Sequence, residues 1–181
     1  MGEDRFYRNK IYADDLEFYE VSVRETDLYV GTDENIYDKT LASVIKYRNY
    51  IENYIIHNPA FLTSLVPIAD DSFAPPIIKD MINYSKIAGV GPMASVAGAV
   101  SHYVGSQLLQ YSNNVIIENG GDDFIKTSKA ANVSIYAGSS PLSEKIVLKI
   151  RPEEMPAGIC TSSGTIGHSL SFGRADAVCV L

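Results

Sequence analysis

The stretch VIIENGGDDF, residues 115–124, lies where the pattern of the chain changes from helices to strands. Three strand-favouring residues, Val115 to Ile117, run directly into an acidic, glycine-rich segment. Glycine and aspartate are typical turn formers, so the segment can be a turn in solvent. It can also be a place where the backbone approaches a ligand closely, because glycine carries no side chain. The flanking segments decide which fold surrounds it.

The segments at the N-terminal end predict strands followed by a long helix. Residues 5–30 are rich in Tyr, Phe and Val, and apolar and polar residues partly alternate there, which predicts two or three antiparallel strands. Over residues 34–57 the apolar residues recur every three or four positions, which predicts an amphipathic helix. Thr32 or Asp33 is the expected cap of this helix, and Asn58-Pro59 ends it.

Two further helices are predicted before residue 115. Residues 76–88 form a short helix, because proline is tolerated in a first turn and Gly89 follows the last apolar position. Residues 92–111 form a helix rich in alanine, serine and glycine, a composition that permits very close approach by a partner or a ligand.

The rest of the chain, residues 115–181, is interpreted as strands and loops. After the strand at 115–117, further strands are expected near 124–127, 131–137, 144–150, 157–161 and 176–181. The order of strands, helices and strands predicts an α+β, or mixed α/β, fold with helices layered on a largely antiparallel sheet. We expect residues 1–181 to form a single domain.

Composition excludes several classes of protein. The net charge of −7 and the pI of about 4.9 argue against a nucleic-acid partner, because phosphate affinity comes mainly from Lys and Arg. The sequence has no signal-peptide core and no run of 18 apolar residues, so we expect a cytoplasmic protein without a membrane partner. Two cysteines, Cys160 and Cys179, make no disulfide framework, and each is either a small buried hydrophobe or a reactive thiol.

Three segments carry residues suited to ligand binding. The first precedes the small-residue helix, where free backbone N–H groups suit phosphate, although tight helix packing is an equal alternative. It comprises Gly91, Pro92, Met93, Ala94 and Ser95. The second follows the strand at 115–117, and its carboxylates could bind a ribose hydroxyl or Mg²⁺. It comprises Asn119, Gly120, Gly121 and Asp122.

The third segment is rich in hydroxyl groups, which suit a phosphate or the edge of a flavin. It comprises Thr161, Ser162, Ser163, Gly164 and Thr165, followed by His168. The G-x-S-x-G pattern of a serine hydrolase is absent. His168 is either a hydrogen-bonded structural residue or a catalytic base.

Taken in order, these motifs resemble one family. G-x-G-P-M-A-S-V-A-G, E-N-G-G-D-D and T-S-S-G-T-x-G-H are similar to motifs of the ApbE-like proteins, relatives of the FAD-dependent FMN transferases. The resemblance covers residues 75–181 and is closest to a small soluble branch of that superfamily. It implies a flavin pocket between the sheet and the helices, lined by the three segments.

The resemblance also implies a cofactor and roles for two residues. FAD or FMN would be the bound flavin, and Mg²⁺ would bridge its phosphates with help from Asp122. Asp122 and His168 would be the catalytic residues of an FMN transferase or of an FAD pyrophosphatase-type enzyme.

The chain departs from the transferase pattern at several points. The small-residue helix has neither the Lys-Gly pair nor the later aspartate of the transferases. Ala175-Asp176-Ala177 resembles their Ala-Asp-Ala-x-x-Thr metal motif in letters but precedes it in order. We therefore expect that a C-terminal segment of the domain is missing. Because no lipobox cysteine is present, we do not expect this protein to be an exported lipoprotein.

Two alternative functions remain open at this point. The pocket could bind another small metabolite, with the protein acting as an accessory in cofactor or sulfur metabolism and Cys160 supplying thiol chemistry. The protein could also be an oligomeric interaction protein without a ligand, since twelve tyrosines and the apolar helix can supply an interface. A homo-oligomer is expected in either case.

Overall fold

The computed structural model describes residues 6–136, 141, 143–162 and 177–180. Its strands are Glu17–Val23 (β1), Thr26–Thr32 (β2), Val115–Glu118 (β3), Asp122–Lys126 (β4), Ala131–Ser134 (β5), Val147–Ile150 (β6), Ala157–Ser162 (β7) and Ala177–Val180 (β8). Over the described residues, the main sheet has six antiparallel strands in the spatial order β1-β2-β3-β4-β7-β8. β5 and β6 form a separate antiparallel pair.

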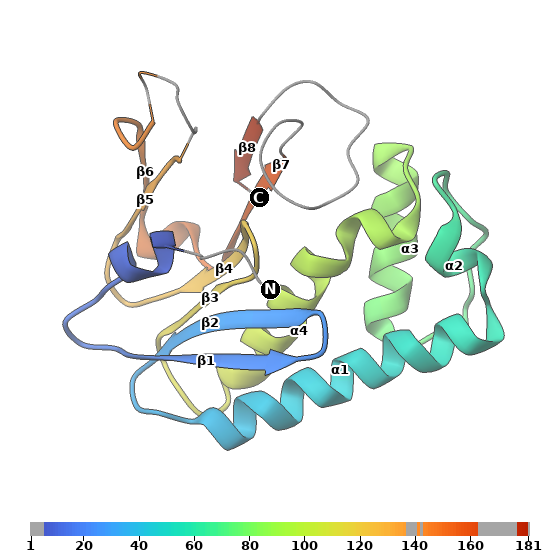
Figure 1. Cartoon of the computed structure of the whole chain (residues 1–181), viewed down its shortest axis with the longest axis horizontal. Coiled ribbons are helices and arrows are strands. Elements are labelled where there is room, and N and C mark those ends of the chain that lie inside the picture. Colours follow the sequence, from blue (N-terminus) through green and yellow to red (C-terminus); the bar gives the residue numbers. More distant parts are fainter. Residues whose placement is uncertain (1–5, 137–140, 142, 163–176, 181) are drawn as a thin grey trace.

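In the order of the chain, the α-helices follow β2 and precede β3. The α-helices are Tyr37–His57 (α1), Ala60–Thr63 (α2), Pro76–Ala88 (α3) and Val96–Leu108 (α4). Short 3-10 helices span Phe6–Lys10 (η1), Pro92–Ser95 (η2) and Pro152–Glu154 (η3). Figure 1 shows α2 and α3 at one end of the molecule and the β5–β6 pair at the other. This arrangement is the α+β fold that the sequence predicts.

The main core lies between the helices and one face of the sheet. It joins apolar side chains of β1, β2, β3, α1, α3 and α4, with Phe124 of β4. Each fully buried aliphatic side chain of this kind contributes about 1.5–3 kcal/mol of hydrophobic free energy. A second, smaller cluster joins Ile125, Ile150, Met155, Ala157 and Ile159. Ile125 is adjacent to Phe124 in β4, so the two clusters lie on opposite faces of the sheet.

The sequence predicts most of these elements correctly. α1 and α3 agree with the predicted helices, and α3 ends at Gly89 in the left-handed conformation with φ of 72°. The strands at β3, β4, β5, β6, β7 and β8 all fall within three residues of their predicted starts. None of the helices in the described part of the chain is both long and apolar enough to cross a bilayer.

Three local predictions were wrong. Residues 6–10, expected as part of a strand, form η1, because Arg8 turns inward to meet carboxylates. The helix expected over 92–111 begins with the 3-10 turn η2 and becomes α-helical at Val96. Neither Thr32 nor Asp33 caps α1. Asp33 instead accepts hydrogen bonds from the loop that precedes β3.

Candidate functional site

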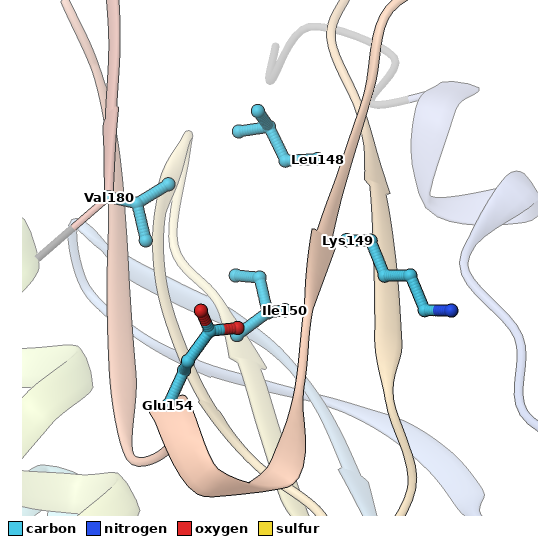
Figure 2. Close-up of a pocket in the computed structure, with 5 residues that line it drawn as sticks. All are labelled: Leu148, Lys149, Ile150, Glu154 and Val180. Carbon is cyan, nitrogen blue, oxygen red and sulfur yellow. The ribbon is translucent and has the colours of Figure 1, made fainter.

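A pocket of about 320 Å³ lies between β6 and β8. Figure 2 shows the side chains of Leu148, Ile150, Glu154 and Val180 converging on it, while Lys149 points away. None of the residues that the sequence singles out lines this pocket. Some of the predicted residues meet elsewhere, at the turn between β3 and β4.

That turn has the geometry that two glycines supply. Gly120 and Gly121 have φ of 65° and 96°, and the Asp122 N–H donates to the Asn119 carbonyl at 3.4 Å. Positive φ at both central residues is the requirement of a type I′ turn, which matches the twist of a β-hairpin. The prediction that this segment forms a turn is therefore confirmed. The residues around the turn determine whether its backbone could also approach a ligand.

Thr161 of β7 packs directly on the turn. Its N–H and its Oγ1 both donate to the Gly121 carbonyl, at 2.9 and 3.0 Å. A Cβ atom on Gly121 would lie 2.1 Å from Thr161 Oγ1. Glycine is therefore required here for close approach as well as for its φ angle.

The first turns of α4 lie on the other side of the same turn. The Asn119 side-chain amide donates to the Ala97 carbonyl at 3.0 Å, and Ser101 Oγ donates to the Asp122 carbonyl at 2.9 Å. Between these two anchors, a Cβ atom on Gly98 would meet no described residue within 4 Å, apart from its chain neighbours and the nearby backbone of α4. The small-residue helix and the double-glycine turn are thus held together beside an open backbone surface.

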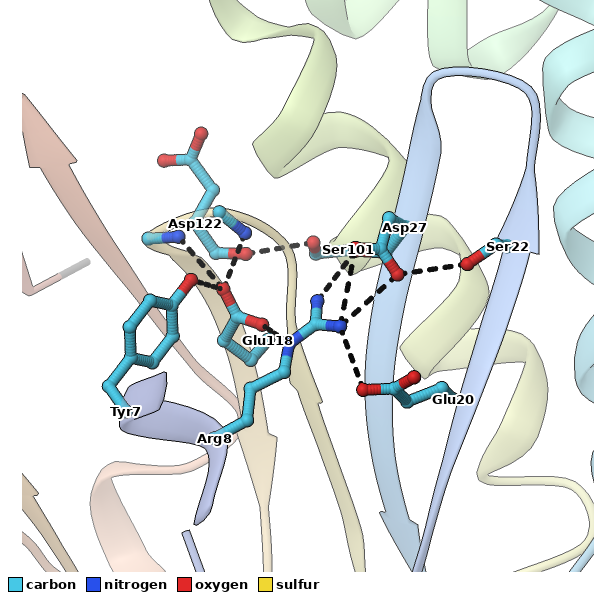
Figure 3. A network of polar contacts seen from close by, with 10 residues as sticks. Tyr7, Arg8, Glu20, Ser22, Asp27, Ser101, Glu118 and Asp122 are labelled. Atoms are coloured by element: carbon cyan, nitrogen blue, oxygen red, sulfur yellow. Dashed lines mark hydrogen bonds and ion pairs between the residues drawn. The ribbon is translucent and has the colours of Figure 1, made fainter. Parts of the chain in front are cut away.

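Glu118 fixes the turn from below, at the end of β3. Its Oε1 accepts from the Gly120 and Gly121 N–H groups at 2.6 and 3.3 Å and from Tyr7 Oη at 2.8 Å. Its Oε2 accepts from Arg8 Nε at 2.7 Å. Figure 3 shows this network under the turn, with the Asp122 carboxylate pointing away from it.

Arg8 connects this network to the hairpin of β1 and β2. It is 5% exposed and donates to the Asp27 carboxylate at 3.1 Å, to the Asp27 carbonyl at 2.9 Å and to Glu20 at 3.4 Å. Burial alone would lower the pKa of Arg8, but the neighbouring carboxylates of Glu118 and Asp27 raise it above the ordinary value. The guanidinium therefore neutralises the buried carboxylate of Glu118 and the half-buried carboxylate of Asp27.

The two aspartates after the turn lie in different environments because β-strand side chains alternate between the two faces. Asp122 lies on the face of Phe124, which packs against α4, and beside its cross-strand neighbour Cys160. Burial raises the pKa of Asp122, and a hydrogen bond from Cys160 opposes the shift.

Asp123 lies on the opposite face, across from Glu118. The residue as a whole is half-buried, yet its Oδ1 is sealed from solvent and has no hydrogen-bond partner among the described residues. Burial, followed by the charges of Glu118 and Asp122, raises the pKa of Asp123 to about 8. This raised pKa favours the protonated form of Asp123 near neutral pH, and Asp122 is the carboxylate on the side of the sheet that packs against α4.

The first predicted segment has a mainly structural environment. Gly91 is buried, and a Cβ atom there would lie 1.8 Å from the Ser64 carbonyl oxygen, so this glycine serves packing. Pro92 is buried as well, and Met93 packs against the main core. Ala94 is exposed and Ser95 is half-buried.

The third predicted segment is only partly described. Thr161 meets the turn as set out above, and the backbone of Ser162 belongs to β7. Ser163, Gly164, Thr165 and His168 lie outside the described residues. Thus the structure brings together Asn119 to Asp122, Thr161 and the start of α4.

A preformed metal cluster is absent from the described part of the chain, where no group of three His, Cys, Asp or Glu side chains is placed to hold an ion. Glu118 is occupied by its four donors and Asp123 is turned away, which leaves Asp122. Mg²⁺ is usually held by one or two carboxylates together with the phosphates of its substrate. Asp122 fits that pattern and does not fit an all-protein metal cage.

Two residues of the site were not predicted from the sequence. Arg8 and Tyr7 lie about 110 positions from Glu118 in the chain, and they orient it. Arg8 lies in an aromatic-rich segment whose pattern predicts a strand, and that pattern does not indicate a contact with Glu118.

The fold and the site together define a class: an antiparallel α+β protein in which a double-glycine hairpin turn is held against a small-residue helix. The chain matches the family described as AbpE bacteria over residues 9–181, and it belongs to that family. It is 45% identical over 164 residues to a UPF0280 protein of Methanococcus aeolicus, an alignment covering 88% of this chain and 66% of that protein.

Other UPF0280 proteins are similar to this chain at comparable identity. A UPF0280 protein of Methanocaldococcus jannaschii is 40% identical over 163 residues, covering 88% of this chain and 66% of that protein. One from Methanospirillum hungatei is 43% identical over 160 residues, covering 87% of this chain and 65% of that protein. The chain thus spans about two thirds of the length of these relatives.

Proposed function

We propose that this protein binds a flavin or another nucleotide-type ligand at the turn between β3 and β4. The observation that carries the proposal is the convergence of separate segments on one open backbone surface. Asn119 binds the Ala97 carbonyl of α4, Thr161 binds the Gly121 carbonyl, and among the described residues no side chain packs on Gly98 between them. A backbone without side chains can approach the flat rings or the phosphates of such a ligand closely.

The resemblance of the sequence motifs to the ApbE-like proteins supports a flavin as the ligand. In this proposal Asp122 supplies the protein carboxylate for Mg²⁺, and the phosphates of FAD supply further oxygen ligands. Transfer of FMN or cleavage of the FAD pyrophosphate is the chemistry that such a site would support. His168 stays a candidate for the proton-transfer step.

The alternative in which Cys160 acts as a nucleophile on a substrate has less support. Burial, followed by a hydrogen bond to Asp122, raises the pKa of the Cys160 thiol to about 12. At neutral pH this side chain is therefore a protonated thiol, and the thiolate is the reactive form.

Incubation of the protein with FAD and Mg²⁺ tests the proposal. We expect saturable quenching of flavin fluorescence and slow appearance of FMN and AMP on chromatography. Asp122→Asn should abolish the Mg²⁺-dependent product while leaving the fold intact, and Asp14→Asn, at an exposed position, serves as the matched control. Neither quenching nor product with the wild-type chain would reject the proposal.

A homo-oligomer is a second candidate property, and exposed apolar residues around α2 and α3 favour it. They are Leu62, Leu65, Val66, Phe73 and Ile87, which are 50–96% exposed. Single exposed hydrophobic residues are ordinary, but a group of them marks association surfaces. Sedimentation should show a dimer or larger species that Ile87→Asp dissociates, and a wild-type monomer at all concentrations would exclude this property.

A further inference from the structure

The two cysteines of the chain lie opposite each other on neighbouring strands. β7 and β8 are antiparallel, and their register pairs Cys160 with Cys179. Both thiols are free; Cys160 is half-buried and Cys179 is exposed. Because directly paired residues point to the same face, both side chains lie on the face that also carries Asp122.

The spacing of such a pair is compatible with a disulfide bond. Directly opposed residues of antiparallel strands have Cα atoms about 4.5–5.5 Å apart. Disulfides join residues whose Cα atoms are about 4.4–6.8 Å apart. Thr161 turns its N–H toward β4, so the backbone groups of Cys160 turn toward β8. The two cysteines therefore form a hydrogen-bonded pair, whose wider Cα spacing of about 5.5 Å lies at the most common spacing of disulfides.

The two thiols have different environments, and this difference sets an order of reaction. Cys179 is open to solvent, so it can meet an external oxidant. Cys160 has Asp122 as its cross-strand neighbour on one side and Cys179 on the other. Because Cys160 is half-buried, it is less accessible than Cys179 to the external oxidant and reacts second.

We propose that Cys160 and Cys179 form a reversible cross-strand disulfide by exchange with a low-molecular-weight disulfide such as oxidised glutathione. The Cys179 thiolate attacks that disulfide and releases one glutathione thiolate. Cys160 then loses its proton to water and attacks the Cys179 sulfur as a thiolate, which releases the second glutathione as a thiolate. Two protein thiols are oxidised to one disulfide, and one glutathione disulfide is reduced to two thiols.

The bond would have a local consequence for Asp122. Its formation removes the thiol hydrogen bond of Cys160 and joins β8 covalently to β7 beside the carboxylate. The redox state of the pair thereby acts on the Asp122 carboxylate. This inference is independent of the ligand, because the disulfide can be measured without one.

Intact-mass analysis of the whole chain in glutathione buffers tests the inference. As the buffer becomes oxidising, we expect the two free thiols per chain to fall to zero and the mass to fall by two hydrogens. Proteolytic cleavage after Arg174 separates the two cysteines, so a linked pair of peptides identifies the bond. Reduction with dithiothreitol should restore both thiols.

Serine variants separate the roles of the two residues. Cys160→Ser should stop at a glutathione adduct on Cys179, and Cys179→Ser should keep an unmodified Cys160. Two free thiols in oxidising wild-type protein, a persistent glutathione adduct, or dimers linked through Cys179 would each overturn the inference. The wild-type masses alone decide the matter if a serine variant does not fold.

Discussion

At the scale of single residues, the adjacent carboxylates of Asp122 and Asp123 in β4 differ in their burial and in their hydrogen bonding. Asp122 lies half-buried on the side of α4, whereas Asp123 has an Oδ1 that is sealed and unpartnered among the described residues. Side-chain alternation along one strand is sufficient to separate them. The sequence predicts a ligand role for Asp122, and that role stays a prediction; the strand geometry places Asp122 on the side of α4 and Asp123 on the opposite face.

Asp123 should make the stability of the protein fall as the pH rises. Its folded pKa of about 8 lies above the ordinary value of 3.8, so unfolding releases a proton throughout this interval. The folding free energy should therefore weaken by on the order of 2–4 kcal/mol between about pH 5 and about pH 8. Asp123→Asn should remove this slope, as measured by urea unfolding at several pH values.

The difference between wild type and variant isolates the contribution of Asp123 from those of other groups. Asp14→Asn, at an exposed position, should leave the slope unchanged. Parallel pH profiles of the wild type and Asp123→Asn would show that Asp123 is ionised in the folded protein.

At the scale of elements, η1 acts as a support for the β3–β4 turn. Arg8 reaches Glu118, and Glu118 accepts from the N–H groups of both glycines. Removal of Arg8 would take its cation away from the buried carboxylate of Glu118 and the half-buried carboxylate of Asp27. We therefore expect the turn to depend on a segment that lies about 110 positions earlier in the chain.

Arg8→Met should destabilise the protein by about 3–5 kcal/mol, because breaking one side of a buried ion pair leaves an uncompensated charge. Arg24→Met removes the exposed pair of Arg24 with Glu52 and should cost less than about 1 kcal/mol. Urea denaturation of both variants makes the comparison. Equal, small losses would mean that Arg8 contributes no more than a surface ion pair.

The glycines of α4 provide a second contrast within one element. A Cβ atom on Gly105 would lie 2.3 Å from the ring of Phe124, whereas one on Gly98 would meet no described residue within 4 Å beyond its neighbours in α4. Gly105→Ala should destabilise the protein by about 1–3 kcal/mol through overpacking. Gly98→Ala should stabilise it by about 0.5–1 kcal/mol, because alanine favours helix. Thermal unfolding that shifts in the same direction for both would contradict this account of the helix.

Elements with a regular period were predictable, and contacts between distant segments were not. The spacing of apolar residues predicts α1 and α3, and Gly89 predicts the end of α3. The 3-10 helix η1 depends on Arg8 meeting carboxylates of three other elements, which no local pattern encodes. Likewise, the packing role of Gly91 requires the loop at Ser64, so the sequence motif alone could not reveal it.

At the scale of the whole molecule, sheet order explains why separated motifs become a site. β3, β4 and β7 are neighbours, so the turn after β3 meets Thr161 of β7, and α4 lies across the same strands. The pocket between β6 and β8 lies apart from this place and is lined by different residues. The fold thus offers two distinguishable locations for a ligand.

Hydrogen–deuterium exchange of the protein with and without FAD and Mg²⁺ tests the proposed location most directly. Bound ligand should protect the backbone of residues 96–99, 118–122 and 160–162 together, because these segments surround the open side of the turn. Residues 147–150, beside the separate pocket, should exchange unchanged. Protection confined to 147–150, or no protection at ligand concentrations that saturate flavin quenching, would contradict the central claim.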